Sequence, residues 1–480
     1  MRLALLAALA AALAVVAPAA AFVPTDPLAA KQWYLQDVHA FDAWPEPPTT
    51  LQPVKVAVVD SGVDCSLADF KDRILDARSF VGGDPCTDTE GHGTFVAGVI
   101  AANLDGQGIV GIAYTSQLLV AKVVRPDGTI PLAAEAAAIR WAADSGARVI
   151  NLSLGGVRDP FHANRDTYSD VEAKAVAYAY AKGAVLVAAV GNGDEAAREP
   201  WPFASYPAAL PHVIGVSALT RTGNVPDYSN RDPLFNDLAA PGSGIFSTFP
   251  LALTAQRPLC VDQGYSDCGT EDYRNPEGTS FAAPQVSAAA ALLFAVQPSL
   301  TNSQATTLLE HSADDVNAAT GCAKCLPLRD AYSGWGRLDV AKALALLAGP
   351  LPAPDRFETN DDAGSSAYTV WGKRAKLTAS ADYYDDPVDV YRVALGPHER
   401  LDARLSGGWA GAQVNLVLWK PGTRKIDEGS RGRPLRAAQS VSPGAKQQVL
   451  FTARTRGWYY VEVRVTSPGF GPYTLQIVKS

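Results

Sequence analysis

The sequence predicts an α/β fold, a parallel sheet with helices on both faces, followed by a small all-β sandwich domain. From residue 54 onward, short apolar runs alternate with longer helical segments, and a series of strand, helix and strand implies a parallel sheet covered on both faces. After a proline-rich stretch at 349–354, the pattern changes to strands of alternating polarity at 388–395, 414–419 and 458–465, which indicates a separate antiparallel domain.

The first residues have the pattern of a secretory signal peptide. Met1-Arg2 is followed by an apolar run up to Val16 and then by Ala19-Ala20-Ala21, so we expect cleavage after Ala21 and a secreted, extracellular protein. No later stretch reaches the roughly 20 uninterrupted apolar residues of a membrane helix, and we therefore expect no membrane span.

Composition indicates a globular protein with two domains. The chain has 480 residues, of which 48% are hydrophobic and 19% charged, enough to bury at least one large core. Its net charge of −8 argues against nucleic acid as a partner. We expect a monomer with a signal peptide (1–21), an α/β domain (22–348), a linker (349–354) and a β-sandwich domain (355–480).

The elements of the α/β domain follow in order. The apolar run 54–60 predicts a buried strand ending in Asp60, and Gly91-His92-Gly93 places a histidine at the head of a helix of small residues. The other expected elements are strand 118–124, helix 131–145, strand 149–154, helix 168–182, strand 185–190 and strand 213–216. Because ligands on parallel sheets bind at the carboxyl ends of the strands, Asp60 and the turn Gly191-Asn192 lie where a site is expected.

Ser280 stands at the start of the longest apolar helix, expected at 281–296. Gly278 allows a tight turn before it, and Pro284 is compatible with the first turn of a helix, where the missing N–H removes no hydrogen bond. Unpaired N–H groups at a helix N-terminus favour negative charge, which suits the oxyanion of acyl transfer. A serine hydroxyl needs a base and a group that orients the base, and the histidine and aspartate upstream supply both.

With these three stretches the sequence resembles the subtilisin-like serine proteases, the subtilase family, over about residues 26–347. The resemblance implies a serine endopeptidase in which Asp60 orients His92, and His92 removes the proton from Ser280 to form an acyl-enzyme. It also implies that Asn192, together with the Ser280 N–H, binds the oxyanion. The expected substrates are polypeptides.

The same resemblance implies a substrate-binding segment and a pocket. Ser153, Leu154, Gly155 and Gly156 match the segment that pairs, as an added strand, with an extended substrate backbone. The primary pocket is expected between this segment and the turn around Gly191, with Ser205 at its floor.

A calcium site is expected at the loop 103–109. The resemblance implies carbonyl ligands from Asn103, Gln107 and Ile109, a side-chain ligand from Asp105, and two further carboxylates from Asp69 and Asp26, in keeping with the oxygen ligands that calcium requires. The alternative is an ordinary turn at Asp105-Gly106 with solvated aspartates.

Six cysteines in an exported chain point to disulfides. Proximity in the sequence suggests Cys65 with Cys86 and Cys260 with Cys268. The third pair, Cys322 and Cys325, is either a tight local disulfide or two thiols.

Residues 355–478 resemble the bacterial pre-peptidase C-terminal domain, on the motifs 355–361, 389–391, 457–461 and 473–475. The roles that the resemblance leaves open are substrate docking, secretion, or none once the domain has been removed. The alternative function for the whole chain is an exported, non-catalytic protein that binds a polypeptide or polysaccharide on a protease-like scaffold. The complete catalytic set favours the enzyme.

Overall fold

The structure, a computed structural model, describes residues 22, 24–45, 51–193, 196–254, 264–351, 356–364, 366–384, 386–408, 411–423, 426 and 435–480. The predicted signal peptide, Cys260 and the second half of the predicted linker lie outside the described residues. The boundaries between the domains therefore stay a prediction.

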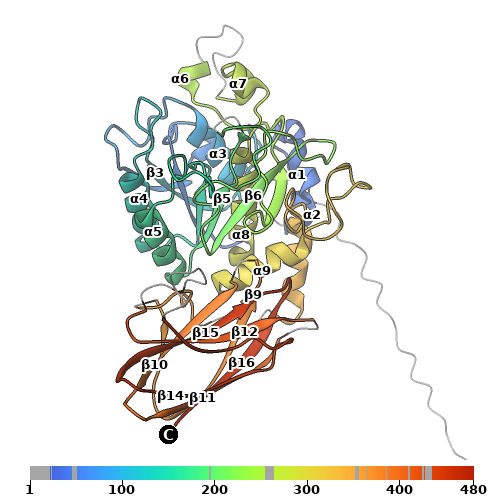
Figure 1. Ribbon diagram of the computed structural model, residues 1–480. Helices are drawn as coiled ribbons and strands as arrows, with labels where there is room; N and C mark the ends of the chain where they lie inside the picture. Colours follow the sequence, from blue (N-terminus) through green and yellow to red (C-terminus); the bar gives the residue numbers. More distant parts are fainter. Residues whose placement is uncertain are drawn as a thin grey trace, which may run out of the picture.

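A seven-stranded parallel sheet is the centre of the larger part of the molecule (Figure 1). Its strands, in the order β2-β3-β1-β4-β5-β6-β7, are β1 (Lys55–Asp60), β2 (Ile74–Ser79), β3 (Gln117–Lys122), β4 (Val149–Leu152), β5 (Val185–Ala189), β6 (Val213–Leu219) and β7 (Leu238–Pro241). The predicted α/β class is confirmed. The sequence missed β2, whose residues are half-buried or exposed, and the four-residue β7, because neither forms a long apolar run.

Helices cover both faces of this sheet. They are α1 (Trp33–Asp37), α2 (Ala40–Ala43), α3 (His92–Ala101), α4 (Leu132–Asp144), α5 (Asp170–Ala181), α6 (Leu251–Thr254), α7 (Glu271–Arg274), α8 (Thr279–Val296), α9 (Asn302–Ser312) and α10 (Val340–Ala345). Side chains alternate between the two faces of a strand. Val56 and Val58 of β1 therefore pack with α3 and α8, whereas Ala57 and Val59 pack with α4 and α5.

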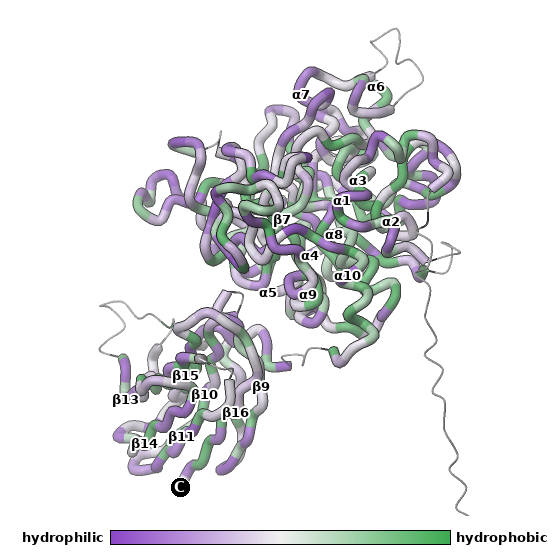
Figure 2. Tube along the Cα trace, turned by 90° about the vertical axis from the view of Figure 1, so that its right-hand side faces the viewer, coloured by the Kyte–Doolittle hydropathy of each residue, from purple (hydrophilic) through white to green (hydrophobic). Residues whose placement is uncertain are grey.

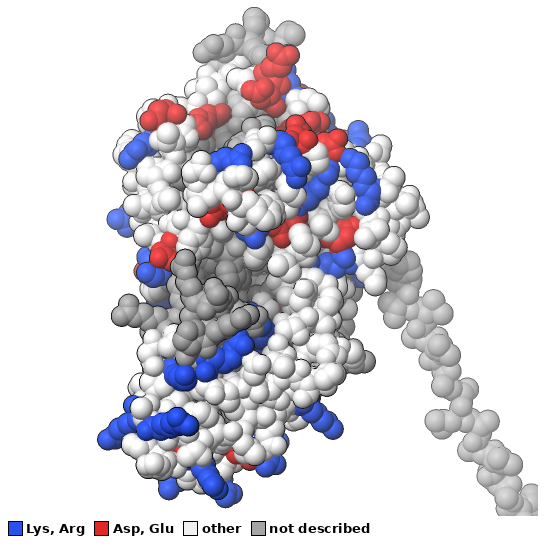
Figure 3. Space-filling view, in the orientation of Figure 1, with Lys and Arg blue, Asp and Glu red and all other residues white. Residues whose placement is uncertain are grey.

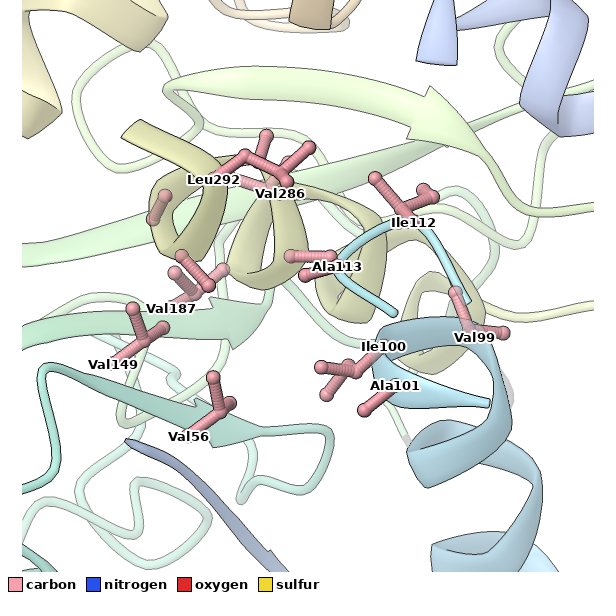
Figure 4. Close-up of a cluster of buried hydrophobic side chains, with 14 of the residues drawn as sticks. Val56, Val99, Ile100, Ala101, Ile112, Ala113, Val149, Val187, Val286 and Leu292 are labelled. Carbon is pink, nitrogen blue, oxygen red and sulfur yellow. The ribbon is translucent and has the colours of Figure 1, made fainter. Parts of the chain in front are cut away.

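The helix α8 runs through the core and packs against the sheet and against α3. Val286 and Leu292 of this helix belong to the same buried cluster as Val149 and Val187 of the sheet and Ile100 of α3 (Figure 4). Among the described residues, α8 is the one helix long and apolar enough to cross a membrane, and 89% of it is buried in the molecule. Its apolar composition is therefore explained by its place in the core.

Two antiparallel sheets form the C-terminal part (Figures 1 and 2). Their strands are β8 (Tyr368–Val370), β9 (Arg374–Asp382), β10 (Val388–Leu395), β11 (Arg400–Gly407), β12 (Val414–Trp419), β13 (Arg436–Ser440), β14 (Gln447–Thr452), β15 (Gly457–Val465) and β16 (Phe470–Lys479). One sheet has the order β13-β12-β15-β10-β8 and the other β14-β11-β16-β9, with only β8 pairing in parallel among them. Inward side chains of both sheets form one apolar cluster, as in a sandwich.

The two parts contact each other below the parallel sheet. The ring of His311, at the end of α9, lies 4.0 Å from that of Phe470 at the start of β16. The side chain of His212 is buried against the C-terminal part, with Nε2 3.1 Å from Asp361 Oδ2. Trp335 also packs on Tyr384, with ring centroids 5.4 Å apart.

Candidate active site

Asp60 and His92 meet at the carboxyl end of β1. Asp60 is the last residue of the strand and His92 the first residue of α3. His92 Nδ1 lies 2.8 Å from Asp60 Oδ1, and the same oxygen accepts the Ser61 N–H at 2.7 Å. The Asp60 side chain is 3% exposed and that of His92 22% exposed. The aspartate thus orients a histidine whose ring still reaches solvent.

A glycine allows the helix to come this close to the strand. A Cβ at Gly93 would lie 2.1 Å from the Gly62 carbonyl oxygen, which is too short for any real contact, and 3.1 Å from Asp60 Cβ. Gly93 therefore allows α3 to approach Asp60, while Gly91 caps the start of the same helix.

Neighbouring carboxylates raise the pKa of His92. Burial of the ring lowers this pKa, but the charge and hydrogen bond of Asp60, with smaller effects from the charges of Asp88 and Glu90, outweigh burial. The pKa of His92 therefore lies above its usual value.

Asp88 supports both members of the pair, a role that the sequence analysis missed. Its Oδ1 accepts the Ser61 hydroxyl at 2.9 Å and the Gly91 N–H at 2.9 Å. Its Oδ2 accepts the N–H and the hydroxyl of Thr94, at 2.9 and 2.7 Å. An aspartate shortly before a helix is typical of an N-terminal cap, so the position of Asp88 four residues before His92 was an available signal.

Ser280 is the second residue of α8 and is half-buried. Its neighbour Phe281 places its ring 5.6 Å from that of His92 and 4.5 Å from that of Phe95. The predicted nucleophile thus begins the helix that packs against the helix of the predicted base.

The expectation for Pro284 was wrong. We expected it in the first turn of α8, but it is the sixth residue of the helix. A proline there lacks the N–H that would bond the carbonyl four residues earlier, which is that of Ser280. The Ser153 hydroxyl donates to this carbonyl oxygen at 2.8 Å and so replaces the missing helical hydrogen bond.

Ser153 is itself held by a buried chain of hydrogen bonds. Asn151 Nδ2 donates to Ser153 Oγ at 2.9 Å, and Ser287 Oγ donates to Asn151 Oδ1 at 2.8 Å. Asn151 and Ser287 are both fully buried. These bonds connect β4 to α8 and fix the turn that carries Ser280.

Asn192 follows β5, and the oxygen of its side-chain amide accepts hydrogen bonds from the first residue of α8. Asn192 Oδ1 accepts the N–H of Thr279 at 3.1 Å and its hydroxyl at 3.0 Å. Because the oxygen is engaged, Nδ2 faces away from Thr279, and a Cβ at Gly278 would lie 3.6 Å from Nδ2. Among the described residues, Nδ2 donates no hydrogen bond. This leaves a donor free beside the start of α8, as an oxyanion site requires.

The predicted substrate-binding residues lie together on one side of the site. The N–H and carbonyl of Gly156 bond the main chain of Tyr206, at 2.8 and 2.9 Å. A Cβ at Gly191 would lie 2.2 Å from Ser205 Oγ, and Ser205 is buried. Since Tyr206 occupies both backbone groups of Gly156, an added substrate strand has residues 153–155 available.

The predicted calcium residues also converge. Asp26 Oδ1 accepts the N–H groups of Asp105 and Gly106, at 3.1 and 3.2 Å, while Asp69 Oδ1 accepts the Ile109 N–H at 3.2 Å. Asp26 Oδ2 is buried without a hydrogen-bond partner among the described residues. Burial, and to a smaller extent the charge of Asp105, raises the pKa of both Asp26 and Asp69.

Two other predicted calcium ligands, Asn103 and Gln107, are held by hydrogen bonds within and beside the loop. The side chain of Asn103 donates to the Lys71 carbonyl at 3.0 Å, and the Gln107 N–H donates to Asp105 Oδ1 at 3.0 Å.

The predicted disulfide of Cys65 with Cys86 is confirmed. Of the two alternatives for the third pair, the structure has a disulfide between Cys322 and Cys325. The predicted partner of Cys268, Cys260, lies outside the described residues.

The chain is similar to known proteins in sequence and in fold. The model of the subtilase family (peptidase S8) matches residues 52–336. The chain is 33% identical to subtilisin DY of Bacillus licheniformis over 264 residues, which are 55% of this chain and 84% of that protein. It is 34% identical to the cell wall-associated protease of Bacillus subtilis strain 168, over 62% of this chain and 31% of that protein. The chain therefore spans less than a third of the second relative.

A solved structure shows the same fold. Sphericase matches with a TM-score of 0.50 and 30% identity, over 64% of this chain and 97% of that chain. The family match ends before the antiparallel sheets begin, so the resemblance of the C-terminal part to the pre-peptidase domain stays a prediction.

Proposed function

Because this chain belongs to the subtilase family, we propose that it is a secreted serine endopeptidase with Asp60, His92 and Ser280 as its catalytic triad. Membership of the family makes it a serine-type peptidase with polypeptide substrates. Beyond that membership, we propose the identity of the catalytic residues, the acyl-enzyme intermediate and secretion.

One observation carries the assignment of the triad. His92 bonds Asp60 through Nδ1 at 2.8 Å, and a histidine held in this way carries its proton on Nδ1 and has Nε2 free to act as a base. The ring also lies against Phe281, next to Ser280. The spacing of these residues in the sequence did not by itself require the contacts of His92 with Asp60 and Phe281.

The proposed reaction proceeds in two stages. Ser280 Oγ attacks the carbonyl carbon of the scissile peptide bond while His92 Nε2 takes the hydroxyl proton. Asn192 Nδ2 and the Ser280 N–H stabilise the negative oxygen, and His92 then gives its proton to the leaving amine as the carbon–nitrogen bond breaks. Water, deprotonated by His92, hydrolyses the resulting ester, and Ser280 regains its proton.

An active-site probe tests the proposal. A fluorophosphonate should label the purified wild-type protein and should not label Ser280→Ala. Ser299→Ala, which removes an exposed serine just after the same helix, is the matched control and should still be labelled. Failure to label the folded wild type would contradict the enzyme and favour a binding protein on the same scaffold.

We also propose that the loop 103–109 binds a structural calcium ion. Asp26, Asp69 and Asp105 would supply carboxylates, and Asn103, Gln107 and Ile109 would supply carbonyl oxygens. The fit rests on the buried Asp26 Oδ2, which has no hydrogen-bond partner among the described residues, and on Asp26 and Asp69, whose pKa is raised mainly by burial and to a smaller extent by the charge of Asp105. A bound cation would stabilise these carboxylates in their charged form and attach the N-terminal segment to the loop that follows α3.

Thermal unfolding of the Ser280→Ala protein tests the calcium site without self-digestion. Calcium should raise the melting temperature with the logarithm of its free concentration, and a chelator should reverse the rise. Asp105→Ala should remove this dependence, whereas Asp127→Ala, at an exposed turn elsewhere, should keep it. A melting temperature of the Ser280→Ala protein that changes with neither calcium nor chelator would exclude the site.

A further inference from the structure

A tyrosine from a distant part of the chain contacts the proposed calcium site. The hydroxyl of Tyr265 donates to Asp69 Oδ2 at 3.0 Å, while the other carboxylate oxygen of Asp69 accepts the Ile109 N–H at 3.2 Å. A Cβ at Gly108 would lie 2.2 Å from the Tyr265 hydroxyl oxygen and 2.4 Å from Asp69 Oδ1. The loop 103–109 therefore passes directly against both side chains.

The carboxylates of the calcium site act on the same hydroxyl. Burial raises the pKa of Tyr265, and the negative charges of Asp69, Asp105 and Asp26 raise it further. The hydroxyl therefore keeps its proton and acts as a hydrogen-bond donor to Asp69. On the face of the molecule in Figure 3, Asp and Glu lie mainly on the peptidase part, which precedes residue 349, and a negative field favours the binding of a cation there.

Tyr265 belongs to two short antiparallel segments, 246–249 and 264–266, which we call the paired segments. Tyr265 lies opposite Thr248, and two main-chain hydrogen bonds, of 2.5 and 3.0 Å, join the segments on either side of this pair. The ring of Tyr265 also stacks on that of Phe246, with ring centroids 5.9 Å apart. The tyrosine is thus held by its main chain and by its ring, and its hydroxyl occupies a defined position.

The paired segments also hold the helix that begins with His92. The Thr248 hydroxyl donates to the Thr94 carbonyl at 2.8 Å, and the Ser247 hydroxyl donates to the Phe95 carbonyl at 2.7 Å. Both carbonyls belong to the first turn of α3. The same two segments therefore contact the calcium site on one side and the start of α3 on the other.

Phe249 extends this contact to the proposed general base. A Cβ at Gly91, the residue before His92, would lie 2.1 Å from the Phe249 ring. Phe249 packs in turn on Tyr273, with ring centroids 4.6 Å apart, and the ring of Tyr273 lies 6.3 Å from that of Phe281, the neighbour of the proposed nucleophile. A continuous series of contacts therefore connects the calcium site with the surroundings of the active site.

We propose that Tyr265 is a positioning residue that orients Asp69 toward the calcium ion, and that the bound ion in return orders the paired segments beside α3. This inference rests on the calcium site proposed above. Hydrogen bonds to a ligating carboxylate hold it in the geometry that the metal needs, and their loss lowers metal affinity by about 10- to 100-fold. Because linkage is reciprocal, a contact that favours calcium binding is itself favoured by calcium, by the same factor.

Calorimetric titration with calcium chloride tests the role of Tyr265 on the Ser280→Ala protein, which does not digest itself. Tyr265→Phe removes one hydroxyl and keeps the ring on Phe246, and it should bind calcium about tenfold or more weakly than the parent. Tyr178→Phe is the matched control, because it removes a hydroxyl that donates to Asp144 at 2.6 Å, and it should bind calcium as tightly as the parent. Equal affinity of Tyr265→Phe and the parent would overturn the proposal and leave the calcium site in place.

Amide hydrogen exchange tests the effect of calcium on the paired segments. Calcium should slow exchange in peptides from 246–249 and 264–266 by about tenfold in the parent, the factor expected from reciprocity, and should have little effect on them in Tyr265→Phe. Asp69→Asn keeps an acceptor for the tyrosine but loses the charge, and it should also abolish the calcium effect.

Several outcomes would contradict the proposed coupling. Calcium-dependent protection of the paired segments that persists in Tyr265→Phe or in Asp69→Asn would overturn it, as would equal exchange in the parent with and without calcium. A parent that binds no calcium would overturn it together with the calcium site. Neither measurement depends on catalysis by Ser280, so the peptidase assignment is tested separately by the fluorophosphonate probe.

Discussion

The disulfide between Cys65 and Cys86 should stabilise the protein more than that between Cys322 and Cys325. The first closes a loop of 21 residues and the second a loop of 3. In the chain-entropy model, loops of these lengths correspond to about 3.3 and about 1.6 kcal/mol. Replacing both cysteines of a pair with serine should therefore lower the free energy of unfolding by about twice as much for the first pair.

Denaturant unfolding followed by helical circular dichroism measures this difference. All described helices precede residue 349, so the helical signal reports the peptidase part without the sandwich. The Ser280→Ala background prevents cleavage during the titration. The Cys322 and Cys325 double variant is the matched control, since it also removes two buried or half-buried sulfur atoms. An equal or larger loss in that control would refute the entropic reasoning.

Four further predictions concern activity, pH and domain organisation. Asn192→Ala should lower kcat by roughly 10²–10³-fold with little change in KM, because the lost donor acts on the transition state; a loss confined to KM would contradict the role. Glu90→Gln should move the acid limb of the profile of kcat/KM to lower pH, since the charge of Glu90 raises the pKa of the catalytic histidine. Burial and the facing Glu172 raise the pKa of Glu135 well above its usual 4.5, so its contribution to stability is complete below about pH 4.5 and is lost as pH rises toward the folded pKa. Glu135→Gln should therefore stabilise the protein more at pH 8 than at pH 4, and equal effects at both would count against the raised pKa of Glu135. A chain truncated after Gly349 should still cleave small peptides, although exposure of the contact surface should lower its melting temperature; an unfolded or inactive product would make the sandwich integral to the peptidase.

Much of the fold could be predicted because the burial of its central elements is uniform. The run ending in Asp60 and the helix after Ser280 are predominantly apolar, and a parallel sheet with a central helix requires such runs. The strand β2 could not be predicted, because its residues are half-buried or exposed at the edge of the sheet.

The supporting contacts of the site were less accessible to sequence analysis. Asp88 joins Ser61 and Thr94, and a bond between residues that are distant along the chain has no periodicity to reveal it. The side chain of Ser153 was expected near substrate only, yet it bonds the carbonyl of Ser280. That bond depends on where Pro284 falls in the helix, which sequence reasoning placed in the wrong turn.

The proline in α8 has a consequence for when the nucleophile becomes ordered. In an isolated helix the turn at Ser280 would lack a hydrogen bond, because Pro284 has no N–H to give. The bond comes from Ser153, at the end of β4 and 127 residues earlier in the chain. Secondary structure alone therefore cannot place the serine, and its geometry is complete only after the helix has docked on the sheet. On the proposed assignment of Ser280, a nascent or partly unfolded chain therefore lacks an organised nucleophile and is not yet able to cleave its neighbours.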